Sequence, residues 1–288
     1  MNFIQWATSP WGERIPTHIS WDLLWVAAIV GVLFLVAHAI YVGFIAKPEA
    51  EAALDSKQAA EAARVPARIT RHTFGARAFH WVMAGAMFVL VFSAFLPKIG
   101  YQFDWVKMHW IAGVVLTISV VYHVFHSTLV LDFWSIWPDS QDIEDASNRL
   151  KRARGESAPA PMRSGKYPLE NKLFHLVVLL AGLSVIITGV FMMFRVRTPF
   201  FPRNPYLFGD MTWGLMYVLH GLAGVGFVTL IMAHIYFAVR PEKFFLTKSM
   251  FVGWISKEKF LEHHDPERWQ VEEGAREAGR SKAPEAAI

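Results

Sequence analysis

Histidine is the residue through which this chain is able to hold a redox cofactor. The sequence has 12 histidines and no cysteine, which excludes disulfides, thiolate-ligated iron–sulfur clusters and the attachment of c-type haem. Four of the histidines, His80, His109, His220 and His234, lie in long apolar segments, where polar residues are rare and usually functional. Because neutral imidazole is a common axial ligand of iron, these residues point to non-covalently bound haem.

The spacing of these histidines sorts them into two pairs. His220 and His234 are 14 residues apart, which in an α-helix is close to four turns and about 21 Å, so both side chains point the same way at two depths. His109 is expected at the depth of His220, and His80 at the depth of His234. Two imidazole pairs favour two b-type haems. Zinc is a weaker alternative, because structural zinc sites group their ligands closely and favour thiolates.

A second pairing is compatible with the spacing. His123 follows His109 by 14 residues, so it repeats the interval between His220 and His234 and could replace His80 as the partner of His234. His126 and His175 are expected near the same end of the helices, where a polar pocket, a haem propionate or lipid headgroups would also explain them. From the spacing alone, His80 and His123 both remain candidates.

Long apolar segments supply the helices that must position these residues. Hydrophobic residues make up 54% of the chain and charged residues 18%. Five segments reach the roughly 20 apolar residues that cross a bilayer. The chain is therefore predicted to be an all-α integral membrane protein with transmembrane helices at Trp21–Ala46, Ala76–Ile99, Trp105–Leu131, Leu169–Arg195 and Met211–Val239.

The distribution of positive charge predicts the orientation in the membrane. Residues 47–75, 132–167 and 240–288 carry 20 Lys and Arg, whereas the segments on the opposite side carry three. Since cytoplasmic loops are enriched in Lys and Arg, the N-terminus is expected outside and the C-terminus in the cytoplasm. The first span has no basic leader or cleavage site and is interpreted as retained. The predicted organisation is an outer N-terminus with an extra transmembrane helix (1–46), a cytoplasmic linker (47–75), a dihaem bundle (76–240) and a cytoplasmic tail (241–288).

Several short motifs resemble one known family. Residues 77–81, Arg-Ala-Phe-His-Trp, resemble the signature of the b-type cytochrome subunits of respiratory formate dehydrogenases and nickel–iron hydrogenases, and residues 108–113 resemble their second ligand helix. Residues 219–236 resemble their last helix. The stretch Gly165-Lys166-Tyr167 with Lys172, and the ending Gly253-Trp254 with residues 263–269, are similar to the gamma subunit of formate dehydrogenase.

The resemblance implies a set of ligands, cofactors and partners. It implies a four-helix dihaem bundle plus one extra N-terminal span, with two haem b, the inner one held by His80 and His234 and the outer one by His109 and His220. His123 would then not be a ligand. It further implies an iron–sulfur subunit and a molybdenum or tungsten catalytic subunit on the periplasmic side of a bacterial inner membrane, with quinone as electron partner. The chain itself would transfer electrons and not oxidise formate.

The remaining candidate residues are assigned less specifically. Candidates for pairing with haem propionates are Arg77, Arg195, Arg197 and Arg203, and candidates for a quinone site are Asn171, His175 and His123. Pro168 stands where the family pattern has an amide side chain, and proline cannot supply that hydrogen bond. Gly113 and Gly224 each follow a ligand by four residues and suit either close approach of a macrocycle or ordinary helix packing.

Two other functions are compatible with the sequence. The chain could serve a hydrogenase or another molybdoenzyme, or it could be a stand-alone quinol oxidoreductase of the b561 type that needs no partner. The lipid bilayer is an expected partner in every case. The sequence contains no P-loop or glycine-rich nucleotide fingerprint, and no nucleic-acid partner is expected.

Overall fold

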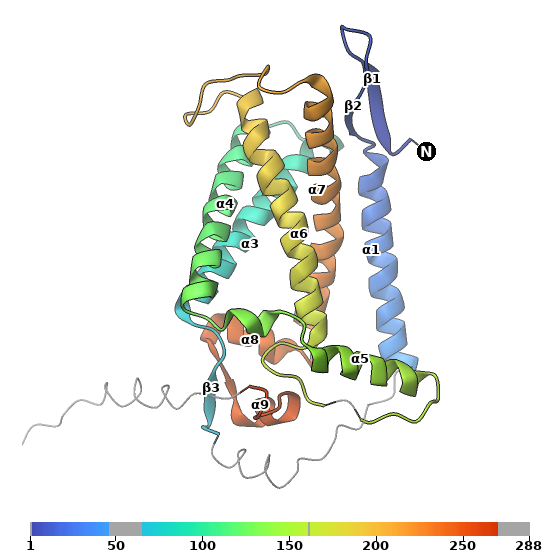
Figure 1. The fold of residues 1–288 in the computed structure, drawn as a ribbon, viewed down its shortest axis with the longest axis vertical. Helices are drawn as coiled ribbons and strands as arrows, with labels where there is room; N and C mark the ends of the chain where they lie inside the picture. The colour runs from blue at the N-terminus through green and yellow to red at the C-terminus, as the bar shows by residue number, and fades with distance from the viewer. Residues whose placement is uncertain (1, 46–64, 161, 270–288) are drawn as a thin grey trace, which may run out of the picture. The chain divides into compact units, whose positions relative to one another are not determined.

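Five long apolar helices dominate the fold (Figure 1). A computed structural model describes residues 2–45, 65–160 and 162–269. Within these residues, five helices are long and apolar enough to cross a membrane by length and composition, which confirms the predicted membrane class. They span Asp22–Ile45, Phe74–Ile99, Trp105–Leu129, Leu169–Arg195 and Asp210–Val239. Each observed boundary lies within two residues of the predicted one where it can be compared; the predicted end at Ala46 lies outside the described residues.

The chain divides into two compact units. The first unit consists of Met1–Lys47, Ala78–Val130 and His175–Arg240, and the second consists of Pro48–Arg77, Leu131–Phe174 and Pro241–Ile288. The long helices of the first unit are α1 (Asp22–Ile40), α3 (Phe74–Phe95), α4 (Trp105–Leu129), α6 (Leu169–Met192) and α7 (Asp210–Val239). Helices α3 and α6 have their first residues in the second unit.

Short connections set the direction of neighbouring helices. Helix α3 ends in a 3₁₀ turn at Leu96–Ile99, and Gly100 follows in the left-handed conformation with φ of 103°. Glycine has no Cβ and adopts this conformation without strain, so the chain reverses and α4 begins at Trp105. Helices α3 and α4 are therefore antiparallel. Residues equally far from Tyr101, at the centre of the connection, are brought to the same depth.

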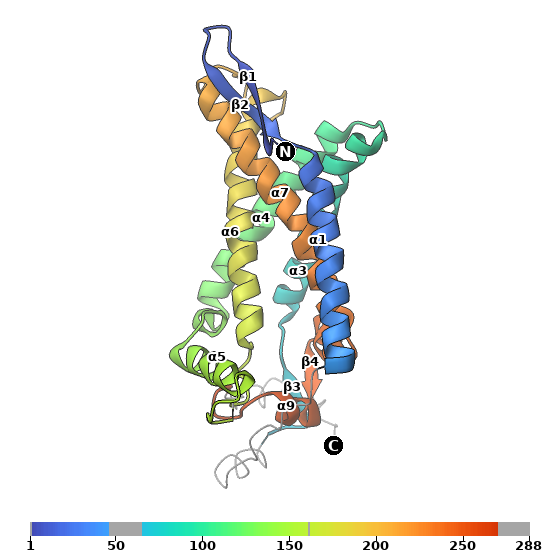
Figure 2. The ribbon, with the colours of Figure 1, turned by 90° about the vertical axis from the view of Figure 1, so that its right-hand side faces the viewer.

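An N-terminal β-hairpin precedes α1 and was not predicted. Strands β1 (Ile4–Thr8) and β2 (Arg14–Ile19) pair antiparallel, and the hairpin lies against one end of α7 (Figure 2). A Cβ added to Gly214 of α7 would overlap the carbonyl oxygen of Pro16. A glycine is therefore required for β2 to come this close to the helix backbone.

The extra first helix also packs along α7 (Figure 2). The hydroxyl of Thr229 donates to the carbonyl of Ala27 at 3.0 Å. A Cβ added to Gly31 would lie 3.1 Å from the sulfur of Met232, so this glycine lets the two helices approach. At the far end, His38 Nδ1 lies 3.2 Å from the guanidinium of Arg240. Helix α1 is thus fixed to the helix that carries His220 and His234.

The second unit has its own small core. Strands β3 (Arg68–Thr70) and β4 (Trp254–Ser256) pair antiparallel, and the unit also contains α5 (Ser140–Ala153), α8 (Phe244–Val252), α9 (Lys257–His263) and a 3₁₀ turn at Phe133–Ile136. Ile69, Ile255 and Phe260 form its buried cluster. Two short segments far apart in the sequence are therefore held together by one strand pair and an apolar core.

Candidate functional site

The structure brings the four sequence-predicted histidines together as two pairs in the first unit. His109 of α4 faces His220 of α7, with ring centres 6.1 Å apart and an angle of 65° between the rings. His80 of α3 faces His234 of α7, with ring centres 6.3 Å apart and an angle of 47°. Helix α7 is continuous from Asp210 to Val239, so the two pairs lie about 21 Å apart along its axis.

The separations within the pairs suit one iron between two imidazoles. Proteins bind metals through imidazole nitrogen at about 2.0–2.1 Å, and the ring centre lies roughly 1.2 Å further away, so two opposed ligands of one metal have ring centres about 6.4 Å apart. The observed values of 6.1 and 6.3 Å agree with this estimate. The residues of both pairs therefore fit a haem iron with two histidine ligands.

The hydrogen bonds of the His109–His220 pair add a second indication. The hydroxyl of Ser93 on α3 lies 2.9 Å from Nδ1 of His109, and the hydroxyl of Thr188 on α6 lies 2.9 Å from Nδ1 of His220. Metal-binding histidines characteristically use the ring nitrogen that does not bind the metal for such a bond. With Nδ1 engaged, Nε2 is the nitrogen left for a metal.

Sequence reasoning missed both hydroxyl residues, although a signal for them exists. Ser93 and His109 are equally distant from Tyr101, and Thr188 and His220 are equally distant from Asn204 in the connection between α6 and α7. In antiparallel helices joined by a short connection, residues equidistant from its centre lie at the same depth. A search for hydroxyl residues at the depth of each histidine would have found them.

Glycines near the pairs differ in their surroundings. A Cβ added to Gly189 of α6 would lie 3.3 Å from Cε1 of His220, so this glycine makes room for the imidazole ring. A Cβ added to Gly113 would come no nearer than 3.9 Å to a side-chain atom of Leu90, and one added to Gly224 would meet no described atom within 4 Å. Neither of the two predicted glycines therefore shows the close helix contact that a packing role requires.

His123 has different neighbours from the four paired histidines. Its ring stacks on Phe79 with centres 4.3 Å apart and an angle of 7°, and its centre lies 6.4 Å from that of His175. His126 stacks on Tyr122 with centres 5.3 Å apart. Nδ1 of His126 and Nδ1 of His175 are buried and have no hydrogen-bond partner among the described residues. The predicted quinone candidates His123 and His175 are thus adjacent, while Asn171 belongs to the second unit.

The predicted propionate candidates have varied contacts. The guanidinium of Arg195 lies over Trp213 and Tyr217, 5.1 and 6.0 Å from the ring centres. Arg203 donates from Nε to the carbonyl of Arg195 at 3.0 Å, and Arg197 is exposed. Arg77 belongs to the second unit, where Nη1 donates to the carbonyl of Phe251. Arg195 therefore combines a positive charge with the aromatic side chains of α7 in the first unit.

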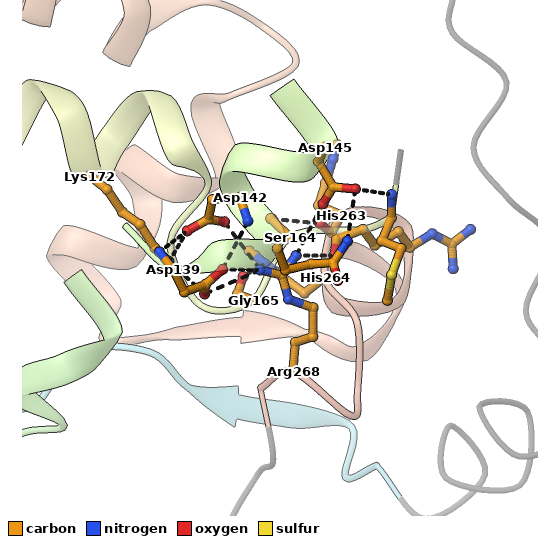
Figure 3. A network of polar contacts seen from close by, with 12 residues as sticks. Asp139, Asp142, Asp145, Ser164, Gly165, Lys172, His263, His264 and Arg268 are labelled. Atoms are coloured by element: carbon orange, nitrogen blue, oxygen red, sulfur yellow. Dashed lines mark hydrogen bonds and ion pairs between the residues drawn. The ribbon is translucent and has the colours of Figure 1, made fainter. Parts of the chain in front are cut away.

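A polar network in the second unit was not predicted (Figure 3). The ammonium of Lys172 lies 2.5 Å from Asp142 and 3.3 Å from Asp139, and Arg268 contacts Asp142 at 3.1 Å and Asp145 at 3.5 Å. Partial burial opposes ionisation of Asp139, but a hydrogen bond from the Asp142 amide and the nearby Lys172 hold the pKa of Asp139 below its usual range. The network attaches the start of α5 to α6 and to the segment after α9.

His264, in the predicted tail motif, is a buried part of the second unit. Its Nδ1 donates to the carbonyl of Gly165 at 2.7 Å, and Arg71 donates from Nη1 to its Nε2 at 3.1 Å. Burial and the neighbouring charge of Arg71 lower the pKa of His264 to about 3. Burial also lowers the pKa of Arg71, to about 10, so Arg71 stays charged at neutral pH while His264 stays neutral. His264 therefore connects the segments that contain Arg71 and Gly165, and both of its ring nitrogens already form hydrogen bonds.

Five apolar helices, three of which carry two facing imidazole pairs, define a class of protein, a multi-pass membrane cytochrome of the b type. The chain belongs to the prokaryotic cytochrome b561 family, whose model matches residues 71–253. It is also similar to the formate dehydrogenase cytochrome b556 subunit of Haemophilus influenzae, with 24% identity over 217 residues that cover 72% of this chain and 84% of that protein. The chain is thus a haem b protein with a role in membrane electron transfer.

Proposed function

We propose that this chain is the dihaem membrane subunit of a respiratory complex and carries electrons between a periplasmic iron–sulfur and molybdo- or tungstoenzyme and the quinone pool. The observation that carries this proposal is the pair of bis-imidazole sites, at 6.1 and 6.3 Å between ring centres, held by one continuous helix at two depths. A single site would serve one side of the membrane only, whereas two sites about 21 Å apart connect its two faces.

The proposed ligands are His109 with His220 for the outer haem and His80 with His234 for the inner haem. The short separations of these two pairs support the assignment. His80 is preferred to His123 because His123 is stacked on Phe79 and lies beside His175. Two histidine ligands leave the iron without an open position, so haem b held in this way supplies one-electron transfer and not oxygen binding.

The proposed orientation places the N-terminus outside and the C-terminus in the cytoplasm of a bacterial inner membrane. It rests on the excess of Lys and Arg in the three segments assigned to the cytoplasm, 20 against three. In this orientation the pair His109–His220 lies near the periplasm and the pair His80–His234 near the cytoplasm. The proposed organisation keeps residues 76–240 as the dihaem bundle, 47–75 as the linker and 241–288 as the tail.

The proposed partner is the remainder of a formate dehydrogenase. The support is the similarity to a formate dehydrogenase cytochrome b556 subunit over most of both chains, together with the motifs at residues 165–167 and 263–269. On this proposal an iron–sulfur subunit delivers electrons at the outer pair. Quinone would accept them near the inner pair, where the adjacent imidazoles of His123 and His175 are the proposed polar contacts. Arg195 is the favoured propionate partner.

The experiment that tests the proposal is gentle purification of the complex from membranes with identification of every co-purifying subunit. Pyridine haemochrome and the reduced-minus-oxidised spectrum then give the haem content. We expect two haem b per chain together with an iron–sulfur subunit and a molybdenum or tungsten subunit. Two haems without a partner would favour a stand-alone quinol oxidoreductase. Co-purification of a hydrogenase large subunit would identify a hydrogenase, and not formate dehydrogenase, as the partner. Absence of haem would overturn the proposal.

A further inference from the structure

The outer histidine pair is contacted by two buried hydroxyl groups from neighbouring helices. Ser93 on α3 is 1% exposed and Thr188 on α6 is 6% exposed. Each hydroxyl oxygen lies 2.9 Å from Nδ1 of the facing histidine, His109 for Ser93 and His220 for Thr188. Both imidazoles of one pair are therefore engaged by the same chemical group in the same way.

The direction of these hydrogen bonds follows from the other bonds of the hydroxyls. Ser93 Oγ lies 2.6 Å from the carbonyl of Val89, and Thr188 Oγ1 lies 2.5 Å from the carbonyl of Ser184. A carbonyl only accepts, so each hydroxyl gives its single proton to its own helix. The hydroxyl oxygen must then accept from the imidazole Nδ1–H. This fixes the tautomer of both rings, with the proton on Nδ1 and the lone pair on Nε2 available for iron.

One ring of the inner pair, that of His80, lacks such a contact. Nδ1 of His80 is buried and has no hydrogen-bond partner among the described residues. An imidazole that donates to an acceptor carries more electron density at its other nitrogen and is a stronger donor to the metal. A stronger donor favours ferric over ferrous iron. The hydroxyl oxygens therefore raise the donor strength of both histidines of the outer pair.

We propose that Ser93 and Thr188 are positioning residues that lower the reduction potential of the haem held by His109 and His220. The inference rests on the proposed ligand assignment and goes beyond it, because it assigns a role to two residues that bind no iron.

The test uses single substitutions in the complete, haem-loaded complex. Ser93→Ala and Thr188→Val remove the hydroxyl with little change in volume, whereas Ser93→Thr and Thr188→Ser keep it. Two matched controls are available in α4: Ser119 and Thr117 donate only to their own helix, at 2.8 Å to the carbonyls of Val115 and Gly113. Ser119→Ala and Thr117→Val therefore remove a hydroxyl that contacts no histidine. Haem content and an optical redox titration are measured for each variant.

We expect Ser93→Ala and Thr188→Val to raise the midpoint of the same one of the two haem components. A single hydrogen bond corresponds to about a threefold to tenfold change in the ratio of oxidised to reduced haem, or ~30–60 mV for one electron. The hydroxyl-retaining variants and both controls should leave the midpoints unchanged. An unchanged midpoint in Ser93→Ala and Thr188→Val, or an equal shift of both components, would overturn the inference.

Failure of the ligand assignment is recognised separately. If His109 and His220 were not ligands, His109→Ala and His220→Ala would keep two haems per chain by pyridine haemochrome, whatever the hydroxyl variants do. If these two variants lose one haem and the hydroxyl variants shift no midpoint, the ligand assignment stands and only the role of Ser93 and Thr188 is wrong.

Discussion

Replacement of Gly214 by alanine should loosen the N-terminal hairpin from α7. The new Cβ would overlap the carbonyl oxygen of Pro16, so β2 must move away from the helix. The position of the Cβ is fixed by the backbone of α7 and its neighbour is a backbone oxygen, so no side-chain rotation relieves the overlap. Overpacking of this kind costs about 1–3 kcal/mol. The gain in helix propensity from glycine to alanine, about 1 kcal/mol, offsets part of this cost.

Gly226 provides the matched control in the same helix. A Cβ there meets no described atom within 4 Å, so Gly226→Ala should gain helix propensity without a clash. The two variants should then differ by about 1–3 kcal/mol in stability, with roughly 2–4 °C in thermal midpoint for each kcal/mol. Trypsin cleavage after Arg14, which is exposed on β2, should accelerate in Gly214→Ala only. Equal midpoints and equal cleavage rates for the two variants would refute the reasoning.

Two further predictions concern acid stability and charge movement. Because the pKa of His264 is about 3 in the folded chain against the ordinary 6.5, the unfolded state binds an extra proton between these values. The second unit should therefore lose about 1.4 kcal/mol of stability per pH unit as the pH falls through this window, measured by hydrogen exchange of Ile69 and Ile255. His264→Gln should weaken this dependence of stability on pH. An unchanged slope of stability against pH in that variant would contradict the prediction. Separately, the complex reconstituted in liposomes should build a membrane potential during quinone reduction, since electrons from outside meet protons from inside; turnover without a potential would contradict the proposed topology.

The features that sequence predicted are those that depend on one helix at a time. The length of an apolar segment and the 14-residue interval from His220 to His234 are properties of a single α-helix. They therefore do not depend on how the helices pack against one another. The choice between His80 and His123 could not be made from spacing, because the two lie at similar distances from the connection between α3 and α4. Only the rotation of each helix about its axis separates them, and the packing of several helices sets that rotation.

The features that sequence did not predict are long-range contacts. The role of Gly214 depends on Pro16, almost 200 residues earlier in the chain, and no local pattern links the two. Lys172 would ordinarily be expected at the surface, but its pairing with Asp142 across 30 residues allows it to be buried. Short strands such as β1 and β2 carry little apolar periodicity, and the pairing of their backbones became apparent only in the structure.

Haem content of the histidine variants tests the central claim most directly. The complex is purified with His80, His109, His220 or His234 replaced by alanine, one at a time, and with His123→Ala as the control, and pyridine haemochrome is measured per chain. The account predicts two haem b in the unaltered protein and in His123→Ala, and loss of haem in each of the other four variants. Loss of haem in His123→Ala with two haems retained in His80→Ala would contradict the assignment of the inner pair, and two haems retained in all five variants would contradict histidine ligation as proposed.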